Sequence, residues 1–286
     1  FSFNVDNRFR IKNLAIDSDI YINHLEYEKP SFYNNYIDNK DDSIHIKNHK
    51  IKSIFKNDNL IIQGYGKIKL VNKLDDINYK INFKDKDLSL TSNLKLNELK
   101  LNKQEYLESF LPKLNKSIDL KDQKIEINYN NQELFIKGRG EIKFASEFEN
   151  INYDILKTKD EYKFNTQIDL EKTLFNIDLL NFKKKDESKA RIDLSGNYYS
   201  DKSINLKKAS VINRNNKIVL EDLLINNINQ IVKINKIDLD FFDNQNKKNK
   251  ILLTRIDEKN YKINGQIFNS DKIIDNLLKS KKKENS

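Results

Sequence analysis

The sequence predicts an all-β protein, an elongated antiparallel sheet with two short helices, and three observations support this prediction. Apolar and polar residues alternate with a period of two in several segments. One alternating stretch returns 74 residues later without a gap. The composition is 37% hydrophobic and 33% charged, against roughly 45–50% and about 25% in typical globular domains. A polar chain with regular alternation fits a sheet with one apolar face better than it fits a disordered chain.

The repeated stretch is residues 60–70, which returns as residues 134–144. An internal period of this length is typical of a stacked β array, in which each unit buries its apolar face against its neighbours. The sequence therefore predicts one elongated segment over 1–286, with repeat units 44–117 and 118–191 and a diverged unit 192–269. The same offset pairs Ile44 with Ile118, Ile51 with Ile125, Ile77-Asn78-Tyr79 with Ile151-Asn152-Tyr153, Leu94 with Ile168 and Leu96 with Leu170.

Parity separates the two faces of these strands, because successive side chains of a strand point to opposite sides. In the later copy the apolar side chains share one face, with Gly138 and Gly140 between them, and charged side chains occupy the other. The apolar set is Leu134, Ile136, Ile142 and Phe144, and the charged set is Lys137, Arg139, Glu141 and Lys143.

The first third of the chain alternates as strands with one irregular stretch. Short hairpins are predicted in residues 1–30, with Asp17-Ser18-Asp19 as a turn. Residues 31–42, rich in Tyr, Asn and Asp, predict a loop or an irregular edge. Residues 103–115 predict an amphipathic helix that Pro112 ends or kinks. Its apolar positions are Tyr106, Leu107, Phe110, Leu111 and Leu114.

The last third again alternates, with Asn and Asp clusters such as 213–216 and 243–246 as turns, because these residues tolerate left-handed backbone. The charge run 183–187 predicts a solvated turn. Ser270 predicts the cap of a terminal helix over about 270–281, with Ile273, Ile274, Leu277 and Leu278 as one stripe.

No catalytic motif occurs, so we expect neither an enzyme nor a cofactor. The Gly64/Gly66 and Gly138/Gly140 pairs lie inside alternating strands and predict a bend or a bare patch in the sheet rather than a phosphate cradle. His45 and His49 share a face in an unbroken strand, but no third ligand follows at a sensible spacing, so no metal site is predicted. The chain has no Cys, which excludes disulfides and thiolate sites.

Neither the net charge of the chain nor its terminal sequence identifies a partner. The net charge of +9 comes mainly from Lys in a chain also rich in Asn and Ile, the composition of an AT-rich genome, and no nucleic-acid partner is predicted. The chain starts with Phe and has no apolar run of about 20 residues, so we expect a piece of a longer protein without its own membrane anchor.

Two patterns carry a resemblance to a known family. The first is Ile168-Asp169-Leu170-Glu171-Lys172-Thr173-Leu174 followed by Phe182-Lys183-Lys184, and the second is Ile263-Asn264-Gly265-Gln266-Ile267-Phe268-Asn269 before an Ile/Leu helix. With the alternating strands and Asn-rich turns, the chain resembles the AsmA-like superfamily, and within it the YhdP-type branch.

The resemblance implies a long sheet curled into a repeating groove lined with aliphatic side chains that conducts phospholipid. The implied partners are phospholipid acyl chains, the outer membrane, and the inner membrane through an anchor outside this segment, in the periplasm of a Gram-negative bacterium. The expected lining residues are Leu60, Ile62, Ile68, Leu70, Leu88, Leu90, Leu94, Leu96, Leu134, Ile136, Ile142, Phe144, Phe164, Ile168 and Leu170.

Two other functions compete with the lipid groove. A structural or adhesive β-sandwich of the cell surface would use its apolar faces internally. A glycan-binding module would need exposed aromatic platforms, and the Tyr residues here are scattered. Lipid that stays with the protein through purification would separate the groove from the sandwich.

Overall fold

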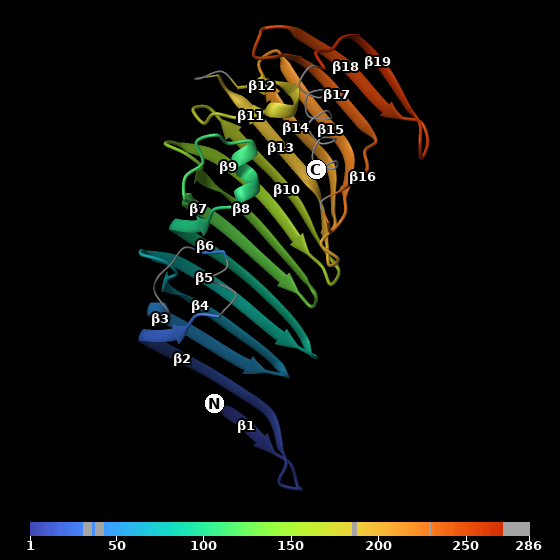
Figure 1. Ribbon diagram of the computed structural model, residues 1–286. Coiled ribbons are helices and arrows are strands. Elements are labelled where there is room, and N and C mark those ends of the chain that lie inside the picture. Colours follow the sequence, from blue (N-terminus) through green and yellow to red (C-terminus); the bar gives the residue numbers. More distant parts are fainter. Residues whose placement is uncertain (31–35, 38–42, 185–187, 229, 271–286) are drawn as a thin grey trace, which may run out of the picture. The chain divides into compact units, whose positions relative to one another are not determined.

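The structure, a computed structural model, describes the chain except for residues 31–35, 38–42, 185–187, 229 and 271–286. Most of it forms one open antiparallel sheet of 17 strands beside a small hairpin, which confirms the predicted all-β class (Figure 1). The strands are β1 Ser2–Val5, β2 Ile11–Glu28, β3 Ser43–Lys56, β4 Asn59–Lys69, β5 Leu74–Lys84, β6 Asp87–Asn102, β7 Ser117–Asn130, β8 Glu133–Lys143, β9 Phe148–Lys157, β10 Glu161–Leu170, β11 Asn176–Ile177, β12 Phe182–Lys183, β13 Ala190–Tyr199, β14 Ile204–Asn213, β15 Asn216–Ile225, β16 Ile231–Lys233, β17 Lys236–Phe242, β18 Lys248–Arg255 and β19 Tyr261–Ile267.

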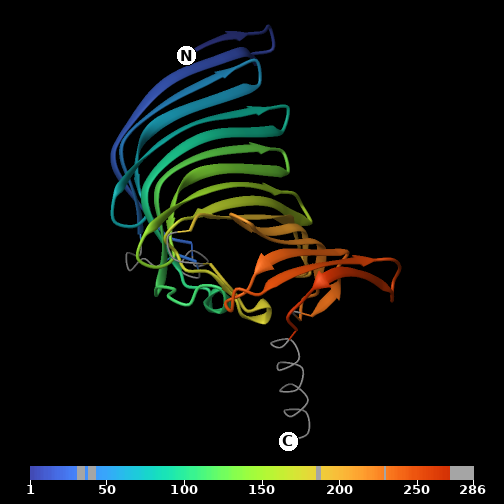
Figure 2. The same ribbon diagram turned by 90° about the horizontal axis from the view of Figure 1, so that it is seen from above.

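The chain divides into two units. Unit 1 contains residues 1–102, 117–141 and 154–159, and unit 2 contains residues 103–116, 142–153 and 160–286. Within each unit the strands pair with their neighbours in chain order, as β2 does with β3 and β17 with β18. In Figure 2 the strands of unit 1, coloured blue to green, bend along their length.

The 74-residue repeat is visible in the bounds of the strands. β7 begins and ends 74 residues after β3, and β8 does so after β4. Left-handed residues recur at the same spacing, with Asn48 and Asp122 inside β3 and β7, and Asn57 and Asn131 in the turns that follow. Among the described residues no Gly has a positive φ, so Asn, Asp and a few other residues supply the left-handed backbone, as the Asn-rich turns predicted.

The predicted turn at Asp17-Ser18-Asp19 is wrong, because β2 continues through it. Asp17 lies opposite Ile54 and Asp19 opposite Lys52, in unbroken register with β3. The two carboxylates occupy the solvent face, where Asp17 Oδ2 lies 3.6 Å from Lys52 Nζ. Exposed Asp residues on a strand thus resemble a turn signal in the sequence.

The predicted helix over 103–115 is shorter and of another type. Only η2, a 3-10 helix over Glu105–Ser109, forms, and the second short helix is η3, Asp178–Leu180. The amides of Phe110 and Leu111 both bond to the carbonyl of Leu107, after which the chain turns at Pro112. The expected terminal helix falls in residues 271–286, outside the described residues. No helix of the described chain has the length and apolar character needed to cross a membrane.

In unit 2 the connection between β10 and β13 folds inward. Phe182 packs edge-on against Phe241, with ring centroids 5.8 Å apart, and both side chains are buried. Lys184 is fully buried and donates from Nζ to the carbonyl oxygen of Glu171 at 2.8 Å. The predicted solvated turn at 183–187 is therefore wrong for Lys184, which satisfies a backbone carbonyl inside the fold, and residues 185–187 lie outside the described residues.

Candidate lipid-binding face

Cross-strand pairing in unit 1 collects apolar side chains into rows on one side of the sheet, which we call the apolar face. Each row crosses several strands, because residues directly opposite each other in antiparallel strands point to the same side. Leu60, Ile62, Leu88 and Leu90 of the expected lining belong to these rows. The rows are Ile16–Phe55–Leu60–Phe83–Leu88, Ser18–Ser53–Ile62–Ile81–Leu90–Tyr129 and Ile20–Ile51–Gly64–Tyr79–Ser92–Ile127.

Most of the expected lining residues are neither buried nor fully exposed. Leu88 is exposed, and the half-buried ones are Leu60, Ile62, Ile68, Leu70, Leu90, Leu94, Leu134, Ile136, Phe164 and Ile168. The buried ones are Leu96, Ile142, Phe144 and Leu170. The half-buried side chains leave part of their apolar surface open to a ligand, whereas the buried four contribute to packing.

Phe144, a buried residue of the expected lining, is bonded to the connection 103–116 in unit 2. The amide of Asn115 donates to the carbonyl oxygen of Phe144 at 2.8 Å, so the connection 103–116 lies against the end of β8. The apolar residues whose spacing predicted a helix therefore lie in an irregular connection, in which Leu111 is buried.

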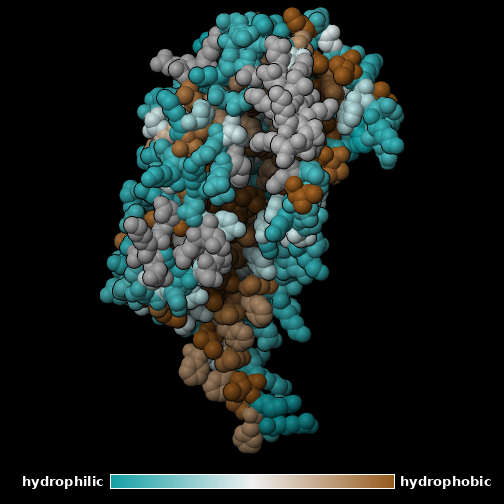
Figure 3. All heavy atoms as spheres, in the orientation of Figure 1, coloured by the Kyte–Doolittle hydropathy of each residue, from teal (hydrophilic) through white to brown (hydrophobic). Residues whose placement is uncertain are grey.

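The most exposed part of the apolar face lies on strands from which no residue was expected in the lining. Ile16 and Ile20 of β2 are exposed, as are Phe3 and Val5 of β1. In Figure 3 apolar side chains gather over these first strands and are bordered by polar ones. The signal was available, because the 74-residue offset also pairs Ile16 with Leu90 and Ile20 with Leu94, but the mistaken turn at Asp17 concealed it.

The glycines of β4 make room for large side chains of neighbouring strands. A Cβ at Gly64 would lie 2.4 Å from Cζ of Tyr79, and a Cβ at Gly66 would lie 2.4 Å from Nδ1 of His49. The two rings stack with centroids 5.5 Å apart, and His49 Nε2 lies 3.2 Å from the Tyr79 hydroxyl. The rings of Tyr79 and His49 therefore fill the bare patch predicted at Gly64 and Gly66, as aromatic side chains often do beside glycine in a sheet.

A few polar groups lie among the apolar rows, and most are bonded within the protein. Asp75 is 1% exposed, and its Oδ1 accepts from the amide and the side chain of Asn97 at 2.7 and 3.0 Å. Burial raises the pKa of Asp75, and the bonds from Asn97 partly offset that effect. Burial also lowers the pKa of His49, which favours the neutral form of its imidazole. Gln123, at the repeat position of His49, donates from Nε2 to the carbonyl of Glu141 at 2.8 Å.

His45 and His49 do not share a face, contrary to the expectation from an unbroken strand. Asn48 has a φ of 50°, and the register between β3 and β4 shifts between Lys47 and Lys50. This irregularity advances the alternation by one residue, so His49 points to the apolar face. Ile46 pairs with Ile68 of that face, and the adjacent His45 therefore points to the opposite side.

Comparison with protein-family models, with curated proteins and with solved structures finds no match to this chain. The resemblance to the AsmA-like superfamily therefore stays a prediction.

Proposed function

We propose that this chain is a non-enzymatic, lipid-conducting segment in which acyl chains lie along the apolar face while head groups remain in water. The observation that carries the proposal is the set of half-exposed aliphatic rows on one face of unit 1. The opposite face at the same strands carries Gln63 and Lys67 of β4 and Lys80 of β5. A surface of this kind binds by apolar contact, which is non-directional, so a bound chain can move along it.

The open apolar area is what distinguishes this proposal from a structural role. Contiguous exposed apolar patches on soluble proteins commonly mark sites for partners, ligands or membranes. Each CH₂ group removed from water contributes about 0.8 kcal/mol, so an acyl chain gains free energy from every row that it crosses. Within the described residues of unit 1, β1 to β7 form a single layer in which each strand pairs with the next. An adhesive sandwich would instead cover this face with a second sheet.

The cellular setting is part of the proposal and follows from the resemblance. In that setting the chain belongs to a longer periplasmic protein of a Gram-negative bacterium, anchored in the inner membrane, that moves phospholipid toward the outer membrane. The geometry of unit 1 supports only the apolar ligand, and the route between membranes needs its own test.

Site-specific crosslinking on adjacent residues tests the apolar ligand. The chain has no native Cys, so a photoreactive probe can be attached at single engineered Cys residues without background labelling. Probes at Ile62 and Ile68 should capture phospholipid in cells, whereas probes at Gln63 and Lys67 should not, because neighbouring positions of a strand face opposite sides. The same contrast is expected between Ile136 and Lys137.

Equal capture on both faces would contradict a one-sided groove. If no position captures lipid and mass spectrometry of the purified protein finds none, the apolar face is covered by protein, as in the sandwich alternative. Ile142 is unsuitable for a probe because it is 6% exposed, so a change there tests folding rather than ligand contact.

A further inference from the structure

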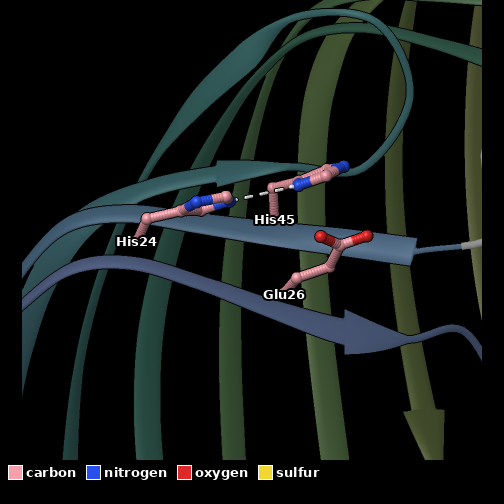
Figure 4. Close-up of side chains that lie close together, drawn as sticks. All are labelled: His24, Glu26 and His45. Atoms are coloured by element: carbon pink, nitrogen blue, oxygen red, sulfur yellow. Dashed lines mark hydrogen bonds between the residues drawn. The ribbon is translucent and has the colours of Figure 1, made fainter.

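Two of the three histidines of the chain meet on the solvent face of unit 1, opposite the apolar face. His24 lies on β2 and His45 on β3, and the rings stack with centroids 5.7 Å apart. His24 Nε2 lies 3.4 Å from His45 Nδ1. Glu26 is directly opposite His45 in the register of β2 and β3, and Figure 4 shows its carboxylate beside the two rings.

The spacing of the ligand atoms fits one small cation. One ligand atom from each of the three side chains lies within 4.8 Å of the other two. Tetrahedral zinc with Zn–N distances of about 2.0–2.1 Å places two ligand nitrogens roughly 3.4 Å apart. The observed separation of the two imidazole nitrogens equals that value, and imidazole with carboxylate is a ligand set that Zn²⁺ accepts.

A hydroxyl group next to the cluster orients two of the three ligands. Ser43 Oγ donates to Glu26 Oε1 at 2.5 Å and lies 3.4 Å from His45 Nε2. With a proton on His45 Nε2, which this hydroxyl can accept as a hydrogen bond, Nδ1 keeps its lone pair for a metal. Hydrogen bonds of this kind to the second ring nitrogen are typical of metal-binding histidines.

Neighbouring lysines set a limit on the affinity. Lys47 lies opposite His24, and Lys69 lies opposite His45 on the β4 side. Their ammonium groups repel a cation, although their long side chains can extend away from the site into water. The cluster therefore suits a transition-metal ion held by imidazole nitrogen rather than Ca²⁺ or Mg²⁺, which require several oxygen ligands.

We propose that His24, Glu26 and His45 bind a divalent transition-metal ion, Zn²⁺ being the one that fits, and that the ion clamps β2 to β3. His24 and Glu26 precede the connection 29–42, and His45 follows it, so the ion joins the two strands where this connection begins and ends. The fourth ligand position is open to water. This inference concerns the solvent face and does not depend on the proposed lipid function.

The second repeat provides an internal comparison. The positions 74 residues after His24, Glu26 and His45 are Glu98, Lys100 and Asp119, and Lys100 again lies opposite Asp119. The same backbone arrangement thus carries no imidazole there, and no such site is expected. Within the part of the chain that the structure describes, His24, Glu26 and His45 form the one group of this kind, so one equivalent of metal is expected.

Isothermal titration of the metal-free full chain with Zn²⁺ tests the proposal. One equivalent should bind, and the thermal midpoint should rise with free Zn²⁺, as it does when a ligand binds only the folded state. Outer-shell partners alone change metal affinity by about 10–100-fold, so His24→Ala and His45→Ala should each weaken binding by at least about 100-fold. Ser43→Ala should weaken it less.

His49→Gln is the matched control, because it removes the third histidine and introduces the residue that the second repeat has at Gln123. It should leave the Zn²⁺ affinity unchanged. A triple change, Glu98→His with Lys100→Glu and Asp119→His, should raise the stoichiometry to two. The proposal is overturned if the wild-type chain binds no Zn²⁺, or if His49→Gln reduces binding as much as His24→Ala does while circular dichroism shows both variants folded.

Discussion

The exposed isoleucines of β2 give the sharpest test of the apolar face. Ile20 points to that face, opposite Ile51, and 49% of it is exposed. Tyr21, the next residue, points to the opposite side, opposite Lys50, and 59% of it is exposed. Ile20→Ser and Tyr21→Ser therefore remove exposed apolar surface from opposite faces at one place in the sheet.

The expected loss in affinity follows from the exposed fraction of Ile20. Burying a whole isoleucine side chain contributes about 1.5–3 kcal/mol, so a ligand that covers the exposed half of Ile20 gains roughly 0.7–1.5 kcal/mol from it. Ile20→Ser should then weaken phospholipid binding by about 3- to 12-fold, taking RT as about 0.59 kcal/mol. Tyr21→Ser should leave binding unchanged, although it removes a larger exposed side chain.

Titration of the purified full chain with a fluorescent phospholipid measures both dissociation constants, and urea denaturation shows that each variant is folded. The Tyr21→Ser variant controls for non-specific binding of lipid to exposed apolar side chains, because such binding would be weakened at least as much by Tyr21→Ser as by Ile20→Ser. Equal weakening by the two variants, or no weakening by Ile20→Ser, would refute the assignment of the apolar face as the binding surface.

Two further predictions concern the groups between the apolar rows. Gly64→Ala should destabilise the fold by about 1–3 kcal/mol in urea denaturation, because the new Cβ meets the ring of Tyr79. The cost should disappear in a Tyr79→Ala background, whereas a glycine needed only for a bend would cost the same in both. Asp75→Asn should flatten the dependence of the free energy of unfolding on pH above about pH 4, the ordinary pKa of an Asp side chain. Burial raises the pKa of Asp75, so the wild type loses stability as pH rises from the ordinary carboxyl pKa toward that raised value, and an unchanged slope in the variant would contradict this account.

Alternation and the repeat predicted most of the strands, because both follow directly from the side chains that a sheet must turn inward. Leu134 and Ile136, for example, lie on β8, as the offset from Leu60 and Ile62 required. The wrong predictions arose where a polar residue type is common in two different structural settings. Asp is common in turns, but Asp17 lies on the solvent face of a long strand. Lys is common on surfaces, but Lys184 donates a hydrogen bond to a backbone carbonyl inside the fold.

The histidine cluster could not be predicted from spacing, because it depends on the register between two strands. His24 and Glu26 reach His45 across the β2–β3 pairing, which the connection 29–42 separates in sequence. Periodicity within one strand contains no information on which residue of the next strand lies opposite. A shift of one residue in register would move His45 to the other face and dissolve the cluster.

One left-handed residue connects the two proposed surfaces. Ile44 and Ile46 precede Asn48 at even positions, and Ile51 follows it at an odd one, yet all three belong to the apolar face, because the irregularity at Asn48 advances the alternation. The same step puts His49 beside Tyr79 and sends His45 outward to His24. Asn is suited to this position, since it adopts left-handed backbone more readily than most residues. The apolar face and the histidine cluster therefore depend on one local feature but lie on opposite sides of the sheet, so a side-chain substitution on one face can abolish lipid binding or Zn²⁺ binding alone.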